Sequence, residues 1–212
     1  MLIQILVDNT NSWIIPYANE LIKQLENKGH EVYLIHSHDD VKEGDILCLL
    51  SCERIFKELH LNKHNLVVHE SDLPKGKGWS PLTWQILEGK DKIPITLFEA
   101  SKEVDAGDIY AKEYIHLEGH ELLDEIKHLQ GLKTKKMIID FVETYPNLDA
   151  YQQEGESTFY PRRKPIDSEL DIDKSIKEQF NLLRVSDNER YPAYFELNGK
   201  KYLIKIYKDE RI

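Results

Sequence analysis

His69 and Asp105 are the side chains in this sequence that are best suited to acid–base chemistry. His69 follows the apolar segment Leu66–Val68, which is expected to be a buried strand. Because ligands of open α/β sheets bind at the carboxyl ends of the strands, an imidazole there can hold or move a proton at a bound molecule. Asp105 stands 36 residues later, in the turn Val104–Asp108, and could return a carboxylate to the same edge. An acid–base pair is predicted, although a lone His is more often a satisfied core or surface residue and the pair alone suits several reactions.

The segment Leu73–Pro81 is a glycine-bearing loop that follows the same strand. Lys75 and Lys77 lie in this loop, where backbone N–H groups and a helix N-terminus can gather on a phosphate. Solvated surface charges are the alternative interpretation of these two lysines. The glycine patterns of dinucleotide-binding and Walker-type loops are absent from the sequence, so neither kind of nucleotide site is predicted.

Short apolar segments and helical patterns alternate along the first two thirds of the chain, and they must position these residues. Periodicity predicts helices over residues 15–28, 82–87 and 122–142. Fully apolar strands between such helices are typical of a parallel sheet that is buried on both faces. We therefore expect an α/β fold with a Rossmann-like, mostly parallel sheet flanked by helices. The predicted strands are Leu2–Val7, Val32–Ile35, Ile46–Leu50, Leu66–Val68, Ile95–Phe98 and Ile109–His116.

The composition changes after Pro146 toward Gln, Glu, Gly, Ser, Pro and Arg. This change predicts a main domain over residues 1–146 and a small C-terminal extension over residues 147–212. Within the extension, the apolar pattern of residues 176–185 predicts a helix, and Asn198-Gly199 between two strand-like segments predicts a β-hairpin. The hairpin could pair across a homodimer or fold onto the main domain of a monomer.

Charge and hydropathy restrict the classes of partner. The chain has 212 residues, with 28 Lys and Arg against 38 Asp and Glu, which gives a net charge of −10. Because nucleic-acid binding usually relies on clustered cations, we expect no nucleic-acid partner, and any anionic ligand must be held by locally placed cations. No run of about 18 apolar residues occurs, so we also expect no membrane partner.

The two cysteines, Cys48 and Cys52, are too few for a disulfide-stapled scaffold, and a reducing cytoplasm is the natural setting. No second Cys pair or spaced His pair completes a tetrahedral zinc site, so no metal is predicted. Both residues are expected to be free, buried thiols that pack as small apolar side chains.

Several motifs occur together in an order that resembles a known family. They are His69-Glu-Ser-Asp-Leu-Pro74, Gly76-Lys-Gly78 with Pro81, Thr96-Leu-Phe-Glu99, and Val104-Asp105-Ala-Gly-Asp108. This combination resembles the formyltransferases that depend on 10-formyltetrahydrofolate. The resemblance implies a formyltransferase fold, 10-formyltetrahydrofolate as cosubstrate, and transfer of a formyl group to an amine. It covers residues 45–115 well and the earlier strands only in outline.

The resemblance also implies roles for individual residues. His69 would hydrogen-bond the developing oxyanion and the amine, and Asp105 would orient His69 and help to accept the amine's proton. One position departs from the family pattern, because Val67 stands where the family has an Asn that helps to hold the formyl oxygen. The residues expected at the folate are Ser51, Cys52, Glu53, Arg54, Ile55, Glu103 and Val104. Those expected at the second substrate are Lys77, Gly78, Trp79, Arg162, Arg163 and Arg184.

The tail of the chain resembles the sugar N-formyltransferase branch, through Tyr160-Pro-Arg-Arg-Lys-Pro165 and Tyr191-Pro-Ala-Tyr-Phe195. The expected partner is therefore a nucleotide-linked amino sugar. A UDP-linked 4-amino-4,6-dideoxy-N-acetylhexosamine of a pseudaminic acid type of pathway is favoured. An enzyme like methionyl-tRNA formyltransferase is one alternative, disfavoured because residues 146–212 carry 12 basic and 13 acidic side chains where that family has a basic domain. An inert module that binds folate or a nucleotide sugar is the other, kept open by Val67.

Overall fold

A six-stranded mixed sheet forms the centre of the protein. The computed structural model describes residues 1–209. The strands lie in the order β2-β1-β3-β4-β6-β7, and the pairs β1–β2, β1–β3 and β3–β4 are parallel. The pairs β4–β6 and β6–β7 are antiparallel, so the sheet changes direction next to β4. The strands are β1 (Leu2–Leu6), β2 (Glu31–Ile35), β3 (Gly44–Leu49), β4 (Asn62–His69), β6 (Lys92–Glu99) and β7 (Ile109–His116).

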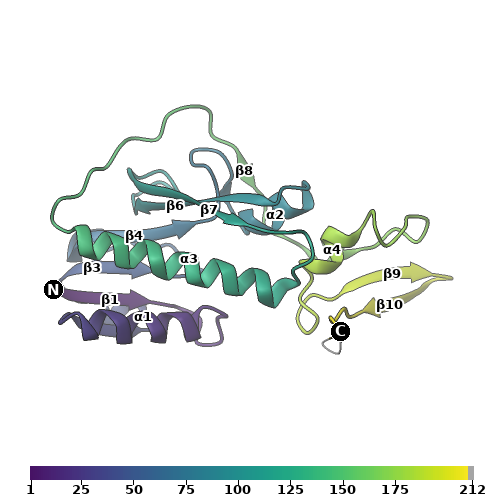
Figure 1. The fold of residues 1–212 in the computed structure, drawn as a ribbon, viewed down its shortest axis with the longest axis horizontal. Helices are drawn as coiled ribbons and strands as arrows, with labels where there is room; N and C mark the ends of the chain where they lie inside the picture. The colour runs from purple at the N-terminus through teal and green to yellow at the C-terminus, as the bar shows by residue number, and fades with distance from the viewer. Residues whose placement is uncertain (210–212) are drawn as a thin grey trace.

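Both faces of this sheet are covered, as the apolar strands predicted. Ile3 and Ile5 of β1 point into the main core cluster, and Leu6 points into a smaller cluster on the opposite face, as the two-residue period of a strand requires. The helices α1 (Ile15–Asn27) and α3 (Leu123–Thr144) pack against the main cluster and lie side by side across the sheet (Figure 1). The expected α/β fold, a mostly parallel sheet flanked by helices, is confirmed.

Short elements lie at the ends of the strands. The helix α2 (Pro81–Leu87) follows the glycine-bearing loop and packs against β6. It begins with a proline, whose fixed φ angle suits the first helical position. Three single turns of 3₁₀-helix cover His38–Asp40, Leu59–Leu61 and Pro165–Ser168.

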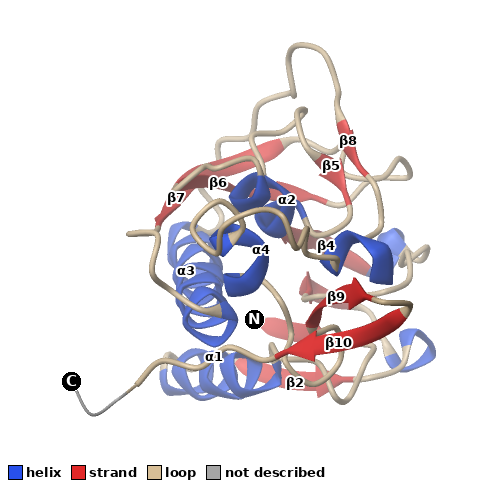
Figure 2. Cartoon of the chain, turned by 90° about the vertical axis from the view of Figure 1, so that its right-hand side faces the viewer, coloured by secondary structure: helices blue, strands red, loops and turns tan. Residues whose placement is uncertain are grey.

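After α3 the chain turns back across the molecule. Residues 147–160, here called the return segment, arch over the sheet from the C-terminal end of α3 (Figure 1). The segment ends in the two-residue strand β8 (Phe159–Tyr160), which pairs in parallel with β5 (Lys77–Gly78) in the glycine-bearing loop. The two strands lie side by side in Figure 2. The beginning of the C-terminal extension therefore contacts the loop that follows His69.

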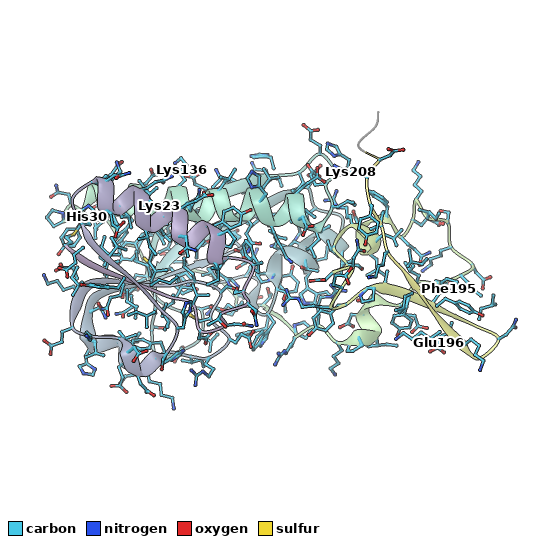
Figure 3. All side chains as sticks on the ribbon, turned by 90° about the horizontal axis from the view of Figure 1, so that it is seen from below. Lys23, His30, Lys136, Phe195, Glu196 and Lys208 are labelled. Atoms are coloured by element: carbon cyan, nitrogen blue, oxygen red, sulfur yellow. The ribbon has the colours of Figure 1, made fainter. Side chains whose placement is uncertain are left out.

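The rest of the extension has its own apolar cluster, built around Leu170, Leu183 and Ala193. It contains α4 (Phe180–Arg184) and a hairpin of β9 (Ala193–Leu197) and β10 (Lys200–Ile204) (Figure 2). The turn residues Asn198 and Gly199 have φ angles of 52° and 71°, as a two-residue hairpin turn requires, so the predicted hairpin is confirmed. Figure 3 shows Phe195 and Glu196 on this hairpin at one end of the molecule.

No helix within residues 1–209 is both long and apolar enough to cross a membrane.

Candidate active site

The structure brings His69 and Asp105 together at the end of β4. The His69 Nε2 and the Asp105 Oδ2 are 3.7 Å apart. Their side chains are only 11% and 13% exposed, so the pair lies in a nearly closed site where electrostatic interactions are stronger than in water. His69 is the last residue of β4, and its antiparallel partner on β6 is Thr96. The acid–base pair that the spacing predicted is therefore geometrically present.

The hydrogen bonds of His69 indicate which ring nitrogen carries a proton. The Nε2 atom is 3.0 Å from the carbonyl oxygen of Gly76, and a carbonyl oxygen can only accept. The Nε2 atom is therefore assigned as the donor of this hydrogen bond. The same Nε2 lies 3.7 Å from Asp105, and its N–H must exchange the Gly76 carbonyl oxygen for a ligand atom before it can donate to a ligand.

A second carboxylate lies next to the pair. Glu70 follows His69 directly, and its Oε1 accepts a hydrogen bond of 2.7 Å from the side chain of Gln130. Burial raises the pKa of Glu70 above its usual range, an effect that the nearby His69 partly offsets.

The turn that carries Asp105 is held at three points. Asp105 has a φ angle of +51°, in the left-handed region that non-glycine residues rarely adopt. Its carboxylate accepts a hydrogen bond of 2.9 Å from the backbone N–H of Gly78. The side chain of Gln153 donates to the carbonyl oxygens of Asp105 and Gly107, at 3.0 and 2.9 Å. At Gly107 an added Cβ would lie 1.7 Å from the carbonyl oxygen of Glu99, so only glycine fits there.

The return segment supports the glycine-bearing loop from the other side. The Gly76 N–H donates to the Thr158 Oγ1 at 2.8 Å, and the Lys77 N–H donates to the Thr158 carbonyl oxygen at 2.9 Å. The Trp79 N–H donates to the Tyr160 carbonyl oxygen at 3.1 Å. A cavity of about 300 Å³ opens beside these contacts. Its lining consists of Ser71, Asp72, Lys75, Gly76, Gln85, Lys90, Pro94, Thr158 and Tyr160.

The residues predicted to contact folate lie in two segments, the loop of residues 51–55 and the start of the Asp105 turn. The loop of residues 51–55 follows β3, which is parallel to β4. The Asp8 carboxylate fixes this loop, because it accepts hydrogen bonds of 2.9 and 3.0 Å from the backbone N–H groups of Glu53 and Arg54.

Ile55 and Val104 are 60% and 49% exposed, so both present apolar surface to the solvent. Ser51, with a φ angle of +51°, and Cys52, whose thiol faces the Leu6 carbonyl oxygen at 3.3 Å, form the start of the loop. Glu103 precedes Val104 and accepts a hydrogen bond of 2.8 Å from Ser101 through its carbonyl oxygen.

The residues predicted at the second substrate are divided between several places. Lys77 and Gly78 form β5, and Lys77 is only 7% exposed. Trp79 is 42% exposed, and the Arg162 guanidinium lies 4.8 Å from its ring centre, a cation–π contact. Arg163 donates to the Asp167 carbonyl oxygen and the Ser168 hydroxyl, at 3.0 and 3.2 Å.

Arg184, the last residue predicted at the second substrate, does not present its side chain to a ligand. Its side chain is 1% exposed, and its Nη1 lies 3.5 Å from the Glu121 Oε2. The guanidinium is therefore enclosed in a buried ion pair between α4 and the residues before α3, with almost no surface for a ligand.

The position where the family resemblance requires an Asn is apolar in the structure. Val67 packs with Leu73, Phe98 and Ile109 in a small apolar cluster. Asn65 does not replace the missing amide, because its Nδ2 donates to the Leu59 carbonyl oxygen at 2.9 Å. Neither residue therefore offers a free amide at this position, and His69 is the predicted catalytic residue here that carries a side-chain N–H donor.

Sequence reasoning missed the residues that support the pair from the return segment. Gln153 and Thr158 follow the main domain by several residues, in a stretch without apolar periodicity. Tyr160 was assigned to a sugar-binding tail, whereas its ring stacks on Trp84 with 6.4 Å between the ring centres. No local signal in the sequence identifies these contacts, because each joins positions more than 40 residues apart.

The cysteines and possible metal ligands add no further chemistry. Burial raises the pKa of the Cys48 thiol to about 12, and the pKa of Cys52 is also raised to about 12, mainly by burial. Both are free, and both are protonated at neutral pH. Within residues 1–209, no group of three His, Cys, Asp or Glu side chains is placed to hold a metal ion.

Known proteins that are similar to this chain are formyltransferases. The sequence pattern of a family described as formyl transferase matches residues 15–141, which is more than half of the chain. Methionyl-tRNA formyltransferase from Thermotoga neapolitana is 30% identical over 163 residues, which cover 74% of this chain and 52% of that protein. The chain spans about half the length of the curated relatives it matches.

Solved structures agree with this similarity. Methionyl-tRNA formyltransferase from Clostridium thermocellum superposes with a TM-score of 0.82 at 25% identity, over 99% of this chain and 94% of that one. HypX from Aquifex aeolicus in complex with tetrahydrofolic acid gives a TM-score of 0.77 at 20% identity, over 96% of this chain and 37% of that one. A sugar N-formyltransferase from Shewanella sp. FDAARGOS_354 gives 0.69 at 16% identity, over 99% and 98%. The last two show the fold.

These findings correct one expectation from the sequence. The prediction of a nucleotide-linked sugar partner and no nucleic-acid partner is wrong, because the curated relatives are enzymes named for methionyl-tRNA. The net charge of a whole chain does not determine the electrostatic potential at one binding site, so a charge of −10 does not exclude a nucleic-acid partner. The match over residues 15–141 spans the helix α1, the end of β4 and the Asp105 turn. The chain therefore belongs to the formyl transferase family.

Proposed function

We propose that this protein transfers a formyl group from 10-formyltetrahydrofolate to a primary amine. The observation that carries the proposal is the nearly enclosed pair of His69 and Asp105, 3.7 Å apart at the carboxyl end of β4. An imidazole N–H and a carboxylate at one place can stabilise a developing oxyanion and receive a proton in the same step. The membership in the formyl transferase family supports the same reaction.

The proposed reaction needs no covalent enzyme intermediate. The amine nitrogen attacks the formyl carbon, and the carbonyl electron pair moves to oxygen, where the His69 Nε2–H donates to the oxyanion. The Asp105 carboxylate accepts the proton that leaves the amine. Collapse of the tetrahedral intermediate breaks the bond between the formyl carbon and N10 of the folate, and N10 takes up that proton. Cys48 and Cys52 take no part, because their raised pKa values keep them protonated.

The folate is proposed to lie between the loop of residues 51–55 and the Asp105 turn. The loop of residues 51–55 follows β3 at the edge where His69 lies, and the Asp105 turn brings its carboxylate within 3.7 Å of His69. Ile55 and Val104 offer exposed apolar surface for a pterin ring. The HypX structure with tetrahydrofolic acid has the same fold, which supports a folate ligand. We expect Ile55→Ser to raise the KM for 10-formyltetrahydrofolate more than it lowers kcat.

The acceptor amine defines the finer function, and methionyl-tRNA is the proposed acceptor, with a sugar amine as the alternative outcome of the test. Methionyl-tRNA is the acceptor in the names of the curated relatives, and a sugar amine is the acceptor in the name of the Shewanella structure. The exposed ring of Trp79, with Arg162 against it, offers a flat cationic surface next to β5. A sugar ring or an unpaired base could stack on that surface.

The test is a formyl-transfer assay with 10-formyltetrahydrofolate and two sets of acceptors. One set is methionyl-tRNA, and the other is a panel of 4-amino-4,6-dideoxyhexoses in their activated forms. The wild type should formylate methionyl-tRNA, and His69→Ala should lose at least about 100-fold in kcat, the usual range for an acid–base group. His60→Ala, at an exposed histidine outside the site, is the matched control.

Failure to formylate any acceptor would contradict the proposal. Full activity of His69→Ala would contradict the assigned role of the imidazole. If Val67→Asn gained an activity that the wild type lacks, the chain would be an inert relative that lost the formyl-binding amide.

A further inference from the structure

Gln153 contacts the turn of Asp105 through both hydrogens of its side-chain NH₂ group. Its Nε2 donates to the carbonyl oxygens of Asp105 and Gly107, at 3.0 and 2.9 Å. Two carbonyl oxygens need two donors, and the amide NH₂ supplies both from one atom. These contacts therefore fix which way the amide faces.

The Gln153 side-chain oxygen has an unusual environment. Because the NH₂ group faces the turn, the Oε1 must face the other way, where it is buried and has no hydrogen-bond partner within the described part of the chain. A buried acceptor without a partner is destabilising. The Gln153 side chain therefore makes two hydrogen bonds through its NH₂ group and leaves its oxygen without one.

The return segment brings Gln153 to the turn through backbone pairing. Two residues earlier, Tyr151 forms an antiparallel bridge with Ile109, with N–H to carbonyl distances of 2.8 and 3.0 Å in the two directions. Side chains two residues apart in extended chain point to the same side, so this bridge sets the position from which Gln153 reaches the turn. The bridge lies at the first residue of β7, which directly follows the Asp105 turn.

We propose that Gln153 is a positioning residue for Asp105. It holds the left-handed backbone at Asp105, and it thereby keeps the carboxylate within reach of both His69 and the Gly78 N–H. This inference rests on the proposed function, because it assigns Asp105 a role in the proton transfer. It also places a residue that supports the site outside the main domain predicted from composition.

The first test uses variants that keep the size of the side chain. Gln153→Glu and Gln153→Met both remove the two donors, and the second adds no charge. Each should lower kcat about 30-fold, which is about 2 kcal/mol, with the KM for the acceptor changed less than about threefold. The exposed neighbour Gln152→Ala is the control and should retain the wild-type rate.

A double-mutant cycle separates positioning from a general effect on the fold. If Gln153 acts through Asp105, then Gln153→Met should cost little or nothing further in an Asp105→Ala background. A full 30-fold loss in that background would overturn the proposal. Unchanged kcat in both Gln153 variants would overturn it as well.

A measurement without catalysis keeps this inference distinct from the proposed function. The Gly78 amide donates to the Asp105 carboxylate, so its proton resonance reports the position of that side chain. The resonance should move upfield in Gln153→Met and stay unchanged in Gln152→Ala. If the wild type transfers no formyl group, the proposed function fails while this experiment still tests Gln153. An unmoved Gly78 resonance in Gln153→Met would refute the positioning role.

Discussion

Arg184 offers a sharp test, because sequence and structure assign it different roles. The sequence placed it among residues that hold an anionic substrate. In the structure its guanidinium is 1% exposed and lies 3.5 Å from the Glu121 carboxylate, which is 8% exposed. Arg184→Met keeps most of the side-chain volume but leaves the Glu121 carboxylate buried without its charged partner.

The expected cost follows from the burial of the pair. Removing one partner of a buried ion pair destabilises proteins by about 3–5 kcal/mol, because the remaining charge stays desolvated. For a chain of this length that corresponds to a fall in Tm of about 6–20 °C. The backbone N–H groups of Glu118 and Gly119 still donate to the Glu121 carboxylate, at 2.6 and 3.0 Å, so we expect the lower half of that range.

Urea unfolding followed by circular dichroism measures this cost. Arg190→Met is the matched control, because Arg190 is 54% exposed and its pair with Asp187 should contribute less than about 1 kcal/mol. Arg184→Met with Glu121→Gln should recover much of the loss, since no buried charge remains. Unchanged stability of Arg184→Met together with a raised KM for the acceptor would refute this reasoning and restore a ligand-binding role.

Three further predictions concern other parts of the structure. Gly107→Ala places a Cβ where the Glu99 carbonyl oxygen lies 1.7 Å away; the turn must shift, and we expect a loss of about 3 kcal/mol in urea unfolding and little formyl transfer. Iodoacetamide at pH 8 should label Cys48 and Cys52 only after unfolding, since the pKa of each thiol is raised to about 12; mass spectrometry of the native protein showing rapid labelling would contradict this. Burial alone would raise the pKa of Glu121, but backbone N–H donors outweigh burial and hold the pKa below its usual range. The stability that Glu121 contributes is therefore present above pH ~4.3 and is lost as the pH falls through the lower folded pKa, so the unfolding difference between wild type and Glu121→Gln should shrink in acid.

The sheet could be predicted from the sequence because its signals are local. Leu2–Leu6 and Ile109–His116 are strands at the positions that their apolar residues indicated. Asn198-Gly199 specified its hairpin through the positive φ angles that the turn requires. β4 was predicted too short, because its first residues, from Asn62 onward, are polar and do not fit an apolar run.

The candidate site could be predicted only in part. His69 stands at the carboxyl end of a buried strand, where ligands of open sheets bind, so its place could be predicted. Asp105 follows β6, which is antiparallel to β4, so strand direction alone does not bring it to His69. The contacts of Gln153 and Thr158 could not be found in the same way, because they join positions 48 and 82 residues apart across an irregular segment. Arg184 was misplaced because a positive charge in a sequence does not reveal whether a carboxylate of the same chain neutralises it.

The return segment divides the assembly of the molecule into two stages. During synthesis, every strand of the central sheet is complete by residue 116. The hydrogen bonds that hold the glycine-bearing loop need residues 158–160, which are made later. Contacts of such long sequence separation form late in folding, because a long loop must close first. In the finished protein these contacts are few, and Thr158 and Phe159 are exposed, so we expect the segment to open at a lower free energy than the sheet. The ability to bind and react would then be gained and lost separately from the fold itself.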